Sequence, residues 1–299
     1  MLDRLTNFLT RTAAKSPVLF MPALSLPWFV YGFRGANTGS YHPRVLRGLT
    51  YAETPQGPQK LDLYLPTGAE PPPGGVLLIH GGGWVTGSRK MTAGWARLLA
   101  THGFVTAAVD YRLLKKAAWP ACFEDCHAAL AWLRDQGTKY GLDPEKIILL
   151  GDSAGAHLAA LLALPAYNPD NRVRGVAALY GPYDLSSPAP GRWPRMCQEL
   201  LLGCKMTEDG AKARAQALSP IRFVDAQAPP FLLIHGKIDT IVPAASSRMM
   251  AAALERAGVP VELILVDGAE HGLFSVRRIK PGLKEINRLM VDFVKRTTG

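Results

Sequence analysis

The sequence predicts an α/β fold in which helices cover both faces of a mostly parallel sheet. From about residue 45 onward, short continuous apolar runs alternate with longer helical stretches. Such runs suit strands that are buried on both faces, and strands that alternate with helices favour a parallel sheet with right-handed crossovers. We expect strands at 61–65, 76–79, 104–109, 147–150, 173–179, 231–234 and 261–266, and helices at 92–101, 124–136, 154–164, 244–257 and 283–295.

The composition allows a large hydrophobic core. Of the 299 residues, 48% are hydrophobic and 19% are charged, which argues against disorder. A chain of this length often forms one α/β domain. We therefore expect a single domain over 45–299, interrupted at about 184–228 by a stretch with several prolines and only short helical patterns. An insertion of that length between strands is usually a lid or a binding loop.

The net charge of +10 predicts a basic surface without a nucleic-acid partner. A basic balance can attract nucleic acids or anionic membranes. Here, however, no nucleic-acid-binding motif accompanies the charge. The densest basic groups are only pairs, such as Arg89-Lys90, Lys115-Lys116 and Arg277-Arg278.

Cysteine usage indicates free thiols in a reducing compartment, so we expect a cytoplasmic protein. The chain has four cysteines, with neither a C-x-x-C pair nor a Cys/His spacing typical of a metal site. We expect no bound metal. Whether Cys197 and Cys204 form a bridge stays open at this point.

A serine in a tight strand-to-helix turn is the strongest functional signal. Gly151-Asp-Ser-Ala-Gly155 follows the apolar strand 147–150 and opens the Ala-rich helix 154–164. Small residues must flank so tight a turn, and the turn presents the hydroxyl of Ser153 to a substrate. The backbone N–H of Ala154, at the helix start, would face a developing oxyanion.

A glycine-rich loop follows the strand 76–79. Three glycines in His80-Gly-Gly-Gly-Trp84 let the backbone approach a ligand closely, and their N–H groups can donate to an oxyanion. No Walker Lys-Ser/Thr follows, and the spacing differs from G-x-G-x-x-G. We expect His80 itself to hold the loop.

A nucleophilic serine needs a base and an acid that orients the base. Among seven histidines, His271 is the candidate base, since it lies beside Gly272 in a loop after the strand 261–266. Asp239, just after the strand 231–234, is the candidate acid. Asp267 and Glu270 are nearer in sequence, but so close a residue would hardly reach the far ring nitrogen. The order Ser, Asp, His is the one expected for α/β hydrolases.

With these motifs the sequence resembles the esterases related to hormone-sensitive lipase and to bacterial feruloyl/acetyl esterases. The resemblance runs from about residue 45 to the C-terminus. It implies an α/β-hydrolase fold and an oxyanion hole formed by Gly82, Gly83 and Ala154. The matching segments are His80–Trp84, Asp110–Leu113, Gly151–His157, Asp239 with Val242-Pro243, and His271-Gly272.

One departure shifts the resemblance within this group. Asp110–Leu113 is followed by Leu-Lys-Lys rather than the Ala-Pro-Glu of the lipase-like branch. That favours the feruloyl/acetyl-esterase and kynurenine-formamidase neighbours, and it leaves the acyl-chain preference open.

We therefore expect a serine carboxylesterase that acts on short- to medium-chain acyl esters without a cofactor. An arylformamidase or another amidase is an alternative, because one triad serves both bonds. A ligand-binding relative without catalysis is a second alternative, although such a protein should lack a triad member. A membrane-associated structural or carrier role is a third.

The N-terminal residues 1–44 have no match in this resemblance. The run 16–33 carries no charge and follows three basic residues, but Pro17, Pro22 and Pro27 interrupt it. We expect a cap over the active site or a surface-bound helix. A signal or anchor, which would make the protein membrane-associated or exported, and a mobile tail are the alternatives.

Overall fold

The computed structural model describes residues 42–67, 74–169, 173–273, 275 and 278–299. The expectations for 16–33, including a cap or a membrane anchor, lie outside these residues. In the part of the chain that is described, no helix combines the length and the apolarity needed to cross a membrane.

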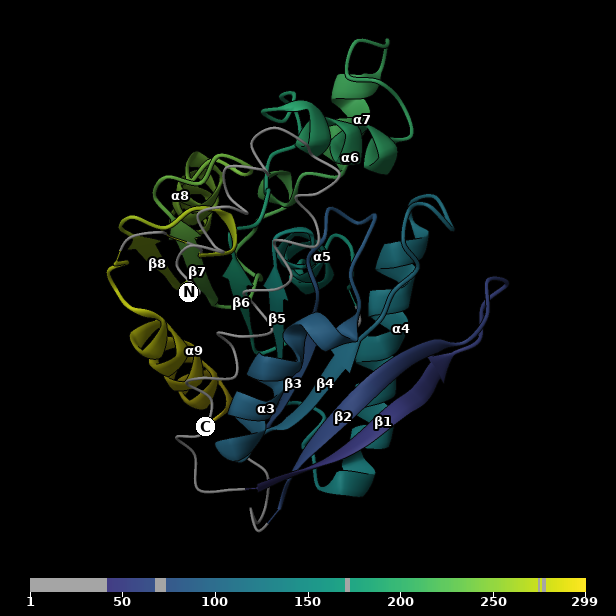
Figure 1. Ribbon diagram of the computed structural model, residues 1–299, viewed down its shortest axis with the longest axis vertical. Coiled ribbons are helices and arrows are strands. Elements are labelled where there is room, and N and C mark those ends of the chain that lie inside the picture. The colour runs from purple at the N-terminus through teal and green to yellow at the C-terminus, as the bar shows by residue number, and fades with distance from the viewer. Residues whose placement is uncertain (1–41, 68–73, 170–172, 274, 276–277) are drawn as a thin grey trace, which may run out of the picture.

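An eight-stranded sheet forms the centre of the described fold, in the order β1-β2-β4-β3-β5-β6-β7-β8 (Figure 1). The first two strands form an antiparallel pair, β2 joins β4 antiparallel, and β3 to β8 run parallel. The strands are β1 (His42–Ala52), β2 (Gln59–Thr67), β3 (Gly75–Ile79), β4 (Val105–Val109), β5 (Ile147–Asp152), β6 (Gly175–Leu179), β7 (Phe231–Gly236) and β8 (Val261–Val266).

Helices cover both faces of the sheet. On one face lie α3 (Ala93–Thr101) and α9 (Leu283–Thr298). The other face carries α4 (Ala121–Gln136), α5 (Ala154–Ala163) and α8 (Ala245–Arg256). Short 3-10 turns complete the set at Arg89–Thr92 (η1), Gly137–Tyr140 (η2), Pro220–Arg222 (η3) and His271–Leu273 (η4).

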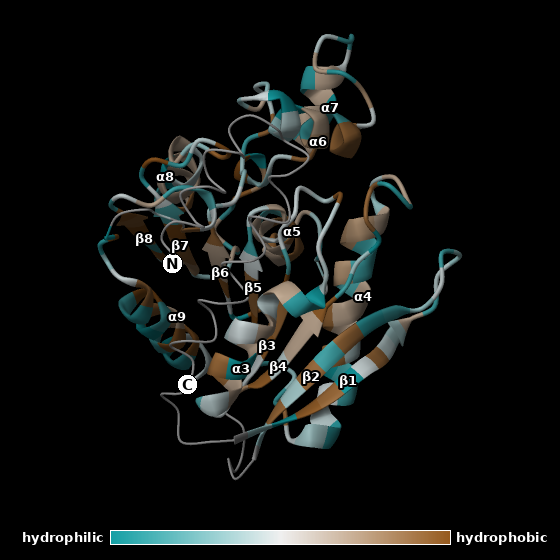
Figure 2. Ribbon diagram, in the orientation of Figure 1, coloured by the Kyte–Doolittle hydropathy of each residue, from teal (hydrophilic) through white to brown (hydrophobic). Residues whose placement is uncertain are grey.

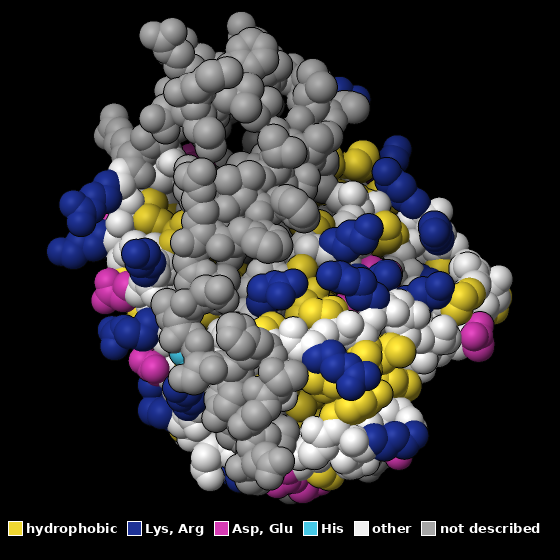
Figure 3. Space-filling model, turned by 60° about the horizontal axis from the view of Figure 1, so that its bottom comes forward, with side chains coloured by type: hydrophobic (Ala, Val, Ile, Leu, Met, Phe, Trp, Pro, Cys, Tyr) yellow, Lys and Arg dark blue, Asp and Glu magenta, His cyan; other side chains and the backbone are white. Residues whose placement is uncertain are grey.

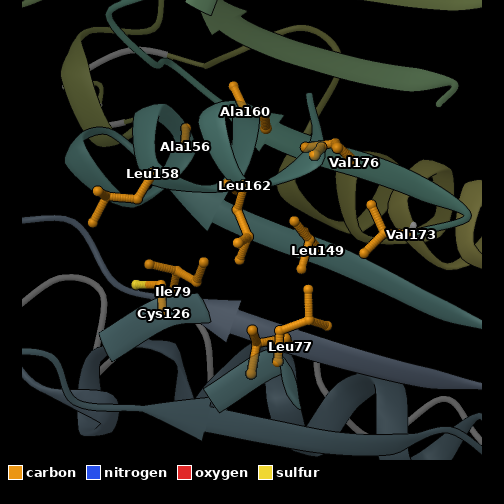
Figure 4. Packing of buried hydrophobic residues seen from close by; sticks show 14 of the residues in the cluster. Leu77, Ile79, Cys126, Leu149, Ala156, Leu158, Ala160, Leu162, Val173 and Val176 are labelled. Carbon is orange, nitrogen blue, oxygen red and sulfur yellow. The ribbon is translucent and has the colours of Figure 1, made fainter. Parts of the chain in front are cut away.

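Alternation along the strands divides the core between the two faces. Leu77 and Leu149 point to the α4/α5 face, while Leu78 and Leu150 point to the α3/α9 face, and all four side chains are fully buried. Figure 4 shows the first cluster, where strand residues meet Cys126 of α4 and Leu158 and Leu162 of α5. Figure 2 shows hydrophobic colour on the central strands and mixed colour on α9, as an amphipathic cover requires. The predicted α/β architecture is confirmed.

The predicted strands and helices are all present, with ends that differ by three residues at most. The prediction did not include β1. Its alternation is interrupted by a register shift between Leu46 and Leu49, where Gly48 donates its N–H to Asp62 Oδ1 at 2.8 Å. A bulge of this kind removes the period of two that identifies a strand. Because β1 begins at His42, the sheet starts three residues before the expected boundary.

The segment 184–228 lies beyond the carboxyl ends of the parallel strands (Figure 1). It carries α6 (Arg192–Leu202) and α7 (Ala211–Ala217). Leu201 and Leu202 of α6 and Ala215 of α7 join the core cluster on the α4/α5 face. The insertion is therefore anchored in the same core as the sheet.

Basic side chains are spread over the surface. Figure 3 shows Lys and Arg in separate groups across the visible described face, with hydrophobic and uncharged residues between them. The net charge of +10 is therefore not gathered there into one continuous patch.

Candidate active site

Ser153 stands on a strained turn between β5 and α5. Its φ of 51° and ψ of −117° lie outside the conformations that residues with side chains prefer. A Cβ on Gly155 would overlap the carbonyl oxygen of Ile79, and a Cβ on Gly151 would overlap that of Gly155. These two positions must therefore be glycine for the turn to sit against the end of β3.

The structure brings Ser153, His271 and Asp239 into one hydrogen-bonded chain. Nε2 of His271 lies 2.9 Å from Ser153 Oγ, and Nδ1 lies 2.8 Å from Asp239 Oδ2. His271 and Asp239 are buried, whereas Ser153, the last member of this hydrogen-bonded series, is half-buried. The imidazole can thus take the serine proton on one side while a carboxylate holds it on the other.

Asp239 is built to stay ionised. Its Oδ1 accepts the backbone N–H groups of Ile241 at 2.9 Å and Val242 at 2.8 Å. Burial opposes ionisation, but the positive charge of His271 and hydrogen bonds from His235 and His271 outweigh it, so the pKa of Asp239 is well below its ordinary value.

The two rival carboxylates are engaged elsewhere. Asp267 Oδ1 pairs with Lys237 Nζ at 2.6 Å, on an exposed part of the surface. Glu270 accepts hydrogen bonds from Thr240, through its N–H at 3.2 Å and its hydroxyl at 3.1 Å. The geometry thus favours Asp239 as the partner of His271.

The glycine loop after β3 lies against the nucleophile turn. Gly81 donates its N–H to Asp152 Oδ1 at 2.9 Å, which joins the loop to the residue before Ser153. Gly82 has a φ of +116°, and a Cβ there would overlap the carbonyl oxygen of Thr86. Ala154 is the first residue of α5, so its N–H has no acceptor within its own helix. Gly82, Gly83 and Ala154 thus lie on the two segments that meet at Ser153.

His80 and Tyr111 hold this loop from behind. Their rings stack with centroids 4.2 Å apart, and the Tyr111 hydroxyl donates to the His80 carbonyl at 2.9 Å. Burial lowers the pKa of His80 to about 4, so the ring is neutral at physiological pH. His80 therefore has the structural role that we expected for it.

His157 supports the turn from below. Its Nε2 donates to the Leu218 carbonyl at 2.8 Å, and its ring meets Trp84 edge-on. Burial lowers the pKa of His157 to about 4. This histidine therefore links α5 to the insertion and to the glycine loop.

The insertion reaches the glycine loop directly. A Cβ on Gly83 would lie 2.8 Å from Cys197 Sγ and 2.8 Å from the far edge of Trp193, both on α6.

Cys197 and Cys204 are free thiols, as are Cys122 and Cys126, so the bridge that the sequence left open is not formed. Among the described residues, no group of three or more His, Cys, Asp or Glu side chains is placed to hold a metal ion.

Sequence reasoning missed three residues around the triad: Asp152, Tyr180 and His235. Tyr180, buried after β6, packs its ring edge-on against His271 with centroids 5.0 Å apart. His235 lies 3.2 Å from Asp239. Only the position of Asp152 beside Ser153 carried a signal, because Tyr180 follows β6 and His235 lies in β7, and both reach the triad only through the tertiary fold.

Asp152 is a buried carboxyl with a raised pKa. Burial raises its pKa from 3.8 to about 6, although the Gly81 N–H, the charge of His271 and the Tyr180 hydroxyl oppose the shift. A carboxyl of this kind favours folding only while it is protonated. Its contribution is complete below the unfolded value of 3.8 and is lost as the pH rises through about 6.

We expect Asp152→Asn to remove this pH-dependent loss of stability. Since one pKa unit corresponds to 1.36 kcal/mol, the free energy of unfolding of the wild type should fall by about 3 kcal/mol relative to the variant between about pH 4 and pH 8. Urea unfolding of both proteins across this range measures the difference. Parallel stability curves for the two proteins would show that the pKa of Asp152 is not raised.

The family comparison and the curated relatives agree on an esterase. Residues 61–254 match the BD-FAE family model. Esterase LipQ of Mycobacterium tuberculosis is 33% identical over 61% of this chain and 46% of its own length. Esterase LipC of the same organism is 33% identical over 83% of this chain and 67% of its own length. The chain thus spans about half of LipQ and two thirds of LipC.

A solved esterase has the same fold. Est2, a thermophilic esterase of the Planctomycetes species Thermogutta terrifontis, is 26% identical, with a TM-score of 0.67 over 85% of this chain and 91% of Est2. Est2 has also been solved with propionate bound and phosphoramylated by tabun.

Proposed function

Because the chain belongs to the BD-FAE family, we propose that it is a serine carboxylesterase in which Ser153 attacks the acyl carbonyl of a small ester. The observation that carries the proposal is the hydrogen-bonded chain from Asp239 through His271 to Ser153, with links of 2.8 and 2.9 Å. The likeness to Est2 confirms the α/β-hydrolase fold predicted from the sequence.

The proposed reaction is acyl transfer in two steps. His271 takes the proton of Ser153 as the hydroxyl attacks, and Asp239 stabilises the imidazolium that forms. The imidazolium then protonates the leaving alcohol, which departs and leaves an acyl-serine. Water, activated by His271 in the same way, releases the acid and restores the serine.

The N–H groups of Gly82, Gly83 and Ala154 are proposed to hold the oxyanion of each tetrahedral intermediate. Two features support this assignment. The loop is tied to the nucleophile turn through Gly81 and Asp152. The left-handed backbone at Gly82 and Gly83 also turns the chain sharply next to Ser153, as an anion-binding loop requires.

We also propose that the segment 184–228 caps the acyl site of the 45–299 hydrolase domain. Trp193 and Cys197 touch the glycine loop at Gly83, so α6 limits the space beside the proposed oxyanion hole. A restricted apolar site rewards each buried methylene by about 0.8 kcal/mol until the chain no longer fits. The propionate in Est2 agrees with a preference for small acids.

We expect the rates on nitrophenyl esters from acetate to octanoate to exceed the rate on palmitate. Trp193→Ala should move this profile toward longer chains, because it opens the space beside Gly83. Met196→Ala, an exposed change on the same helix, is the matched control and should leave the profile unchanged. A profile that stays the same in Trp193→Ala would remove α6 from the acyl site. Faster turnover of an aryl formamide than of every ester would favour the amidase alternative.

A further inference from the structure

We infer that His235 is a positioning residue that holds the carboxylate of Asp239 in the orientation needed by His271. The inference rests on the proposed function, since it assigns Asp239 to the triad. His235 is the fifth residue of β7, and its side chain is completely buried. It lies four residues before Asp239, on the strand from which the Asp239 loop departs.

The contacts of the ring establish which nitrogen carries a hydrogen. Nε2 of His235 lies 2.8 Å from the carbonyl oxygen of Val242, which can only accept. Nε2 therefore donates. In the neutral ring Nδ1 is then an acceptor, and the Ser247 hydroxyl on α8 lies 2.7 Å from it. The ring is thus held from both sides, by α8 and by the loop that carries Asp239.

The same donor faces the catalytic carboxylate. Nε2 carries one hydrogen, which the Val242 carbonyl accepts at 2.8 Å, and Asp239 Oδ2 lies 3.2 Å from the same nitrogen, close to the positive end of this N–H dipole. This Oδ2 is the oxygen that also receives Nδ1–H of His271. The other oxygen receives two backbone N–H groups. Because the Asp239 side chain is completely buried, these N–H groups take the place of water.

Removing the donor should have two effects on the reaction. With less stabilisation from His235, the charge of the carboxylate acts more strongly on His271 and favours the imidazolium. Neutral His271 then forms only at higher pH, so the acidic limb of the kcat/KM profile moves upward. The carboxylate also gains freedom to turn, which lowers kcat because the base is held less well.

Other ionisable groups around this pair are shared by wild type and variant. Burial raises the pKa of Tyr180 and of Tyr183, so neither hydroxyl ionises near neutral pH. The carboxyl of Asp152, in contrast, has a pKa of about 6. The upward shift of the acidic limb that follows loss of the His235 donor must therefore also appear in an Asp152→Asn background. The groups that face His235 or its partners are Asp239, His271, Glu270, Tyr180, Tyr183 and Asp152.

Two substitutions of His235 and a remote control test the inference. His235→Phe keeps a ring but loses the donor, and we expect kcat/KM per titrated active site to fall by at least about tenfold, though by less than the about 10⁴-fold of losing the acid itself. His235→Gln restores an N–H near Nε2 and should recover most of the rate. His127→Phe, which loses the hydrogen bond between His127 of α4 and Asn168 in the segment after α5, should behave as wild type.

The acidic limb separates positioning from a merely structural role. If His235 had only a structural role, its substitution would reduce the amount of folded protein. The acidic limb of the kcat/KM profile would then stay at the same pH in the molecules that still fold. Wild-type kcat/KM and an unmoved limb in His235→Phe would overturn the inference, as would a Gln variant as slow as the Phe variant.

A second measurement does not depend on turnover. In the Ser153→Ala background, NMR titration of the His271 ring should show its charge change at higher pH with His235→Phe than without it. Absence of this shift contradicts the inference about His235. Absence of ester hydrolysis by the wild type contradicts only the proposed function.

Discussion

Ser153→Ala is expected to leave a folded protein with almost no esterase activity. The proposed mechanism passes through an acyl-serine, and the N–H groups around the oxyanion cannot replace the missing nucleophile. Loss of the serine from the triad of another serine hydrolase lowers kcat by about 10⁶. Steady-state hydrolysis of nitrophenyl acetate measures the loss, after contaminating esterase is excluded by labelling with a fluorophosphonate.

The same variant has a clear folding control. The backbone N–H of Ser153 bonds the Leu179 carbonyl at 2.8 Å, and alanine keeps this bond. Thermal unfolding should therefore be nearly unchanged. Hydrolysis near the wild-type rate by a stable, unlabelled Ser153→Ala protein would place the nucleophile elsewhere.

Asp239→Asn is expected to lower kcat by about 10⁴, because the amide can donate to His271 and favour the wrong ring tautomer. The amide of asparagine is nearly the size of the carboxylate, so the fall in kcat measures the loss of the negative charge and the change in hydrogen-bond direction. The measurement is kcat on nitrophenyl acetate, with the concentration of competent sites taken from the burst of nitrophenol.

Asp267→Asn is the matched control for this substitution. Asp267 is nearer to His271 in the sequence than Asp239 is, but it pairs with Lys237 on the surface, where an ion pair contributes about 0–1 kcal/mol. We expect activity close to that of the wild type. If Asp267→Asn were the slower of the two folded variants, the acid would have been assigned to the wrong carboxylate.

Much of the fold was predictable because its signals are local. A parallel strand that is buried on both faces must be apolar throughout, as in 76–79 and 231–234. The tight turn at Ser153 allows only small neighbours, since any Cβ at Gly151 or Gly155 would meet backbone. These burial and steric requirements act within a few consecutive residues, so the local sequence pattern is enough to predict them.

The remaining features depended on contacts between distant segments. The bulge in β1 forms on Asp62 of another strand, and the position of α6 over Gly83 follows from packing rather than from any motif. His235 gave no signal, because its partners come from the Asp239 loop and from α8.

The sequence by itself determined the α/β architecture, the strand-to-helix turn at Ser153 and the glycine loop, because local sterics and burial allow few residues there. The prediction of His271 and Asp239 used their places after two strands. Only the tertiary structure placed His271 Nδ1 2.8 Å from Asp239 Oδ2. It also paired Asp267 with Lys237 and placed His235 beside the Asp239 carboxylate. Hydrogen bonds of this kind join side chains from different strand ends. The distances between these side chains are set by the tertiary packing and cannot be read from the order of residues in the sequence.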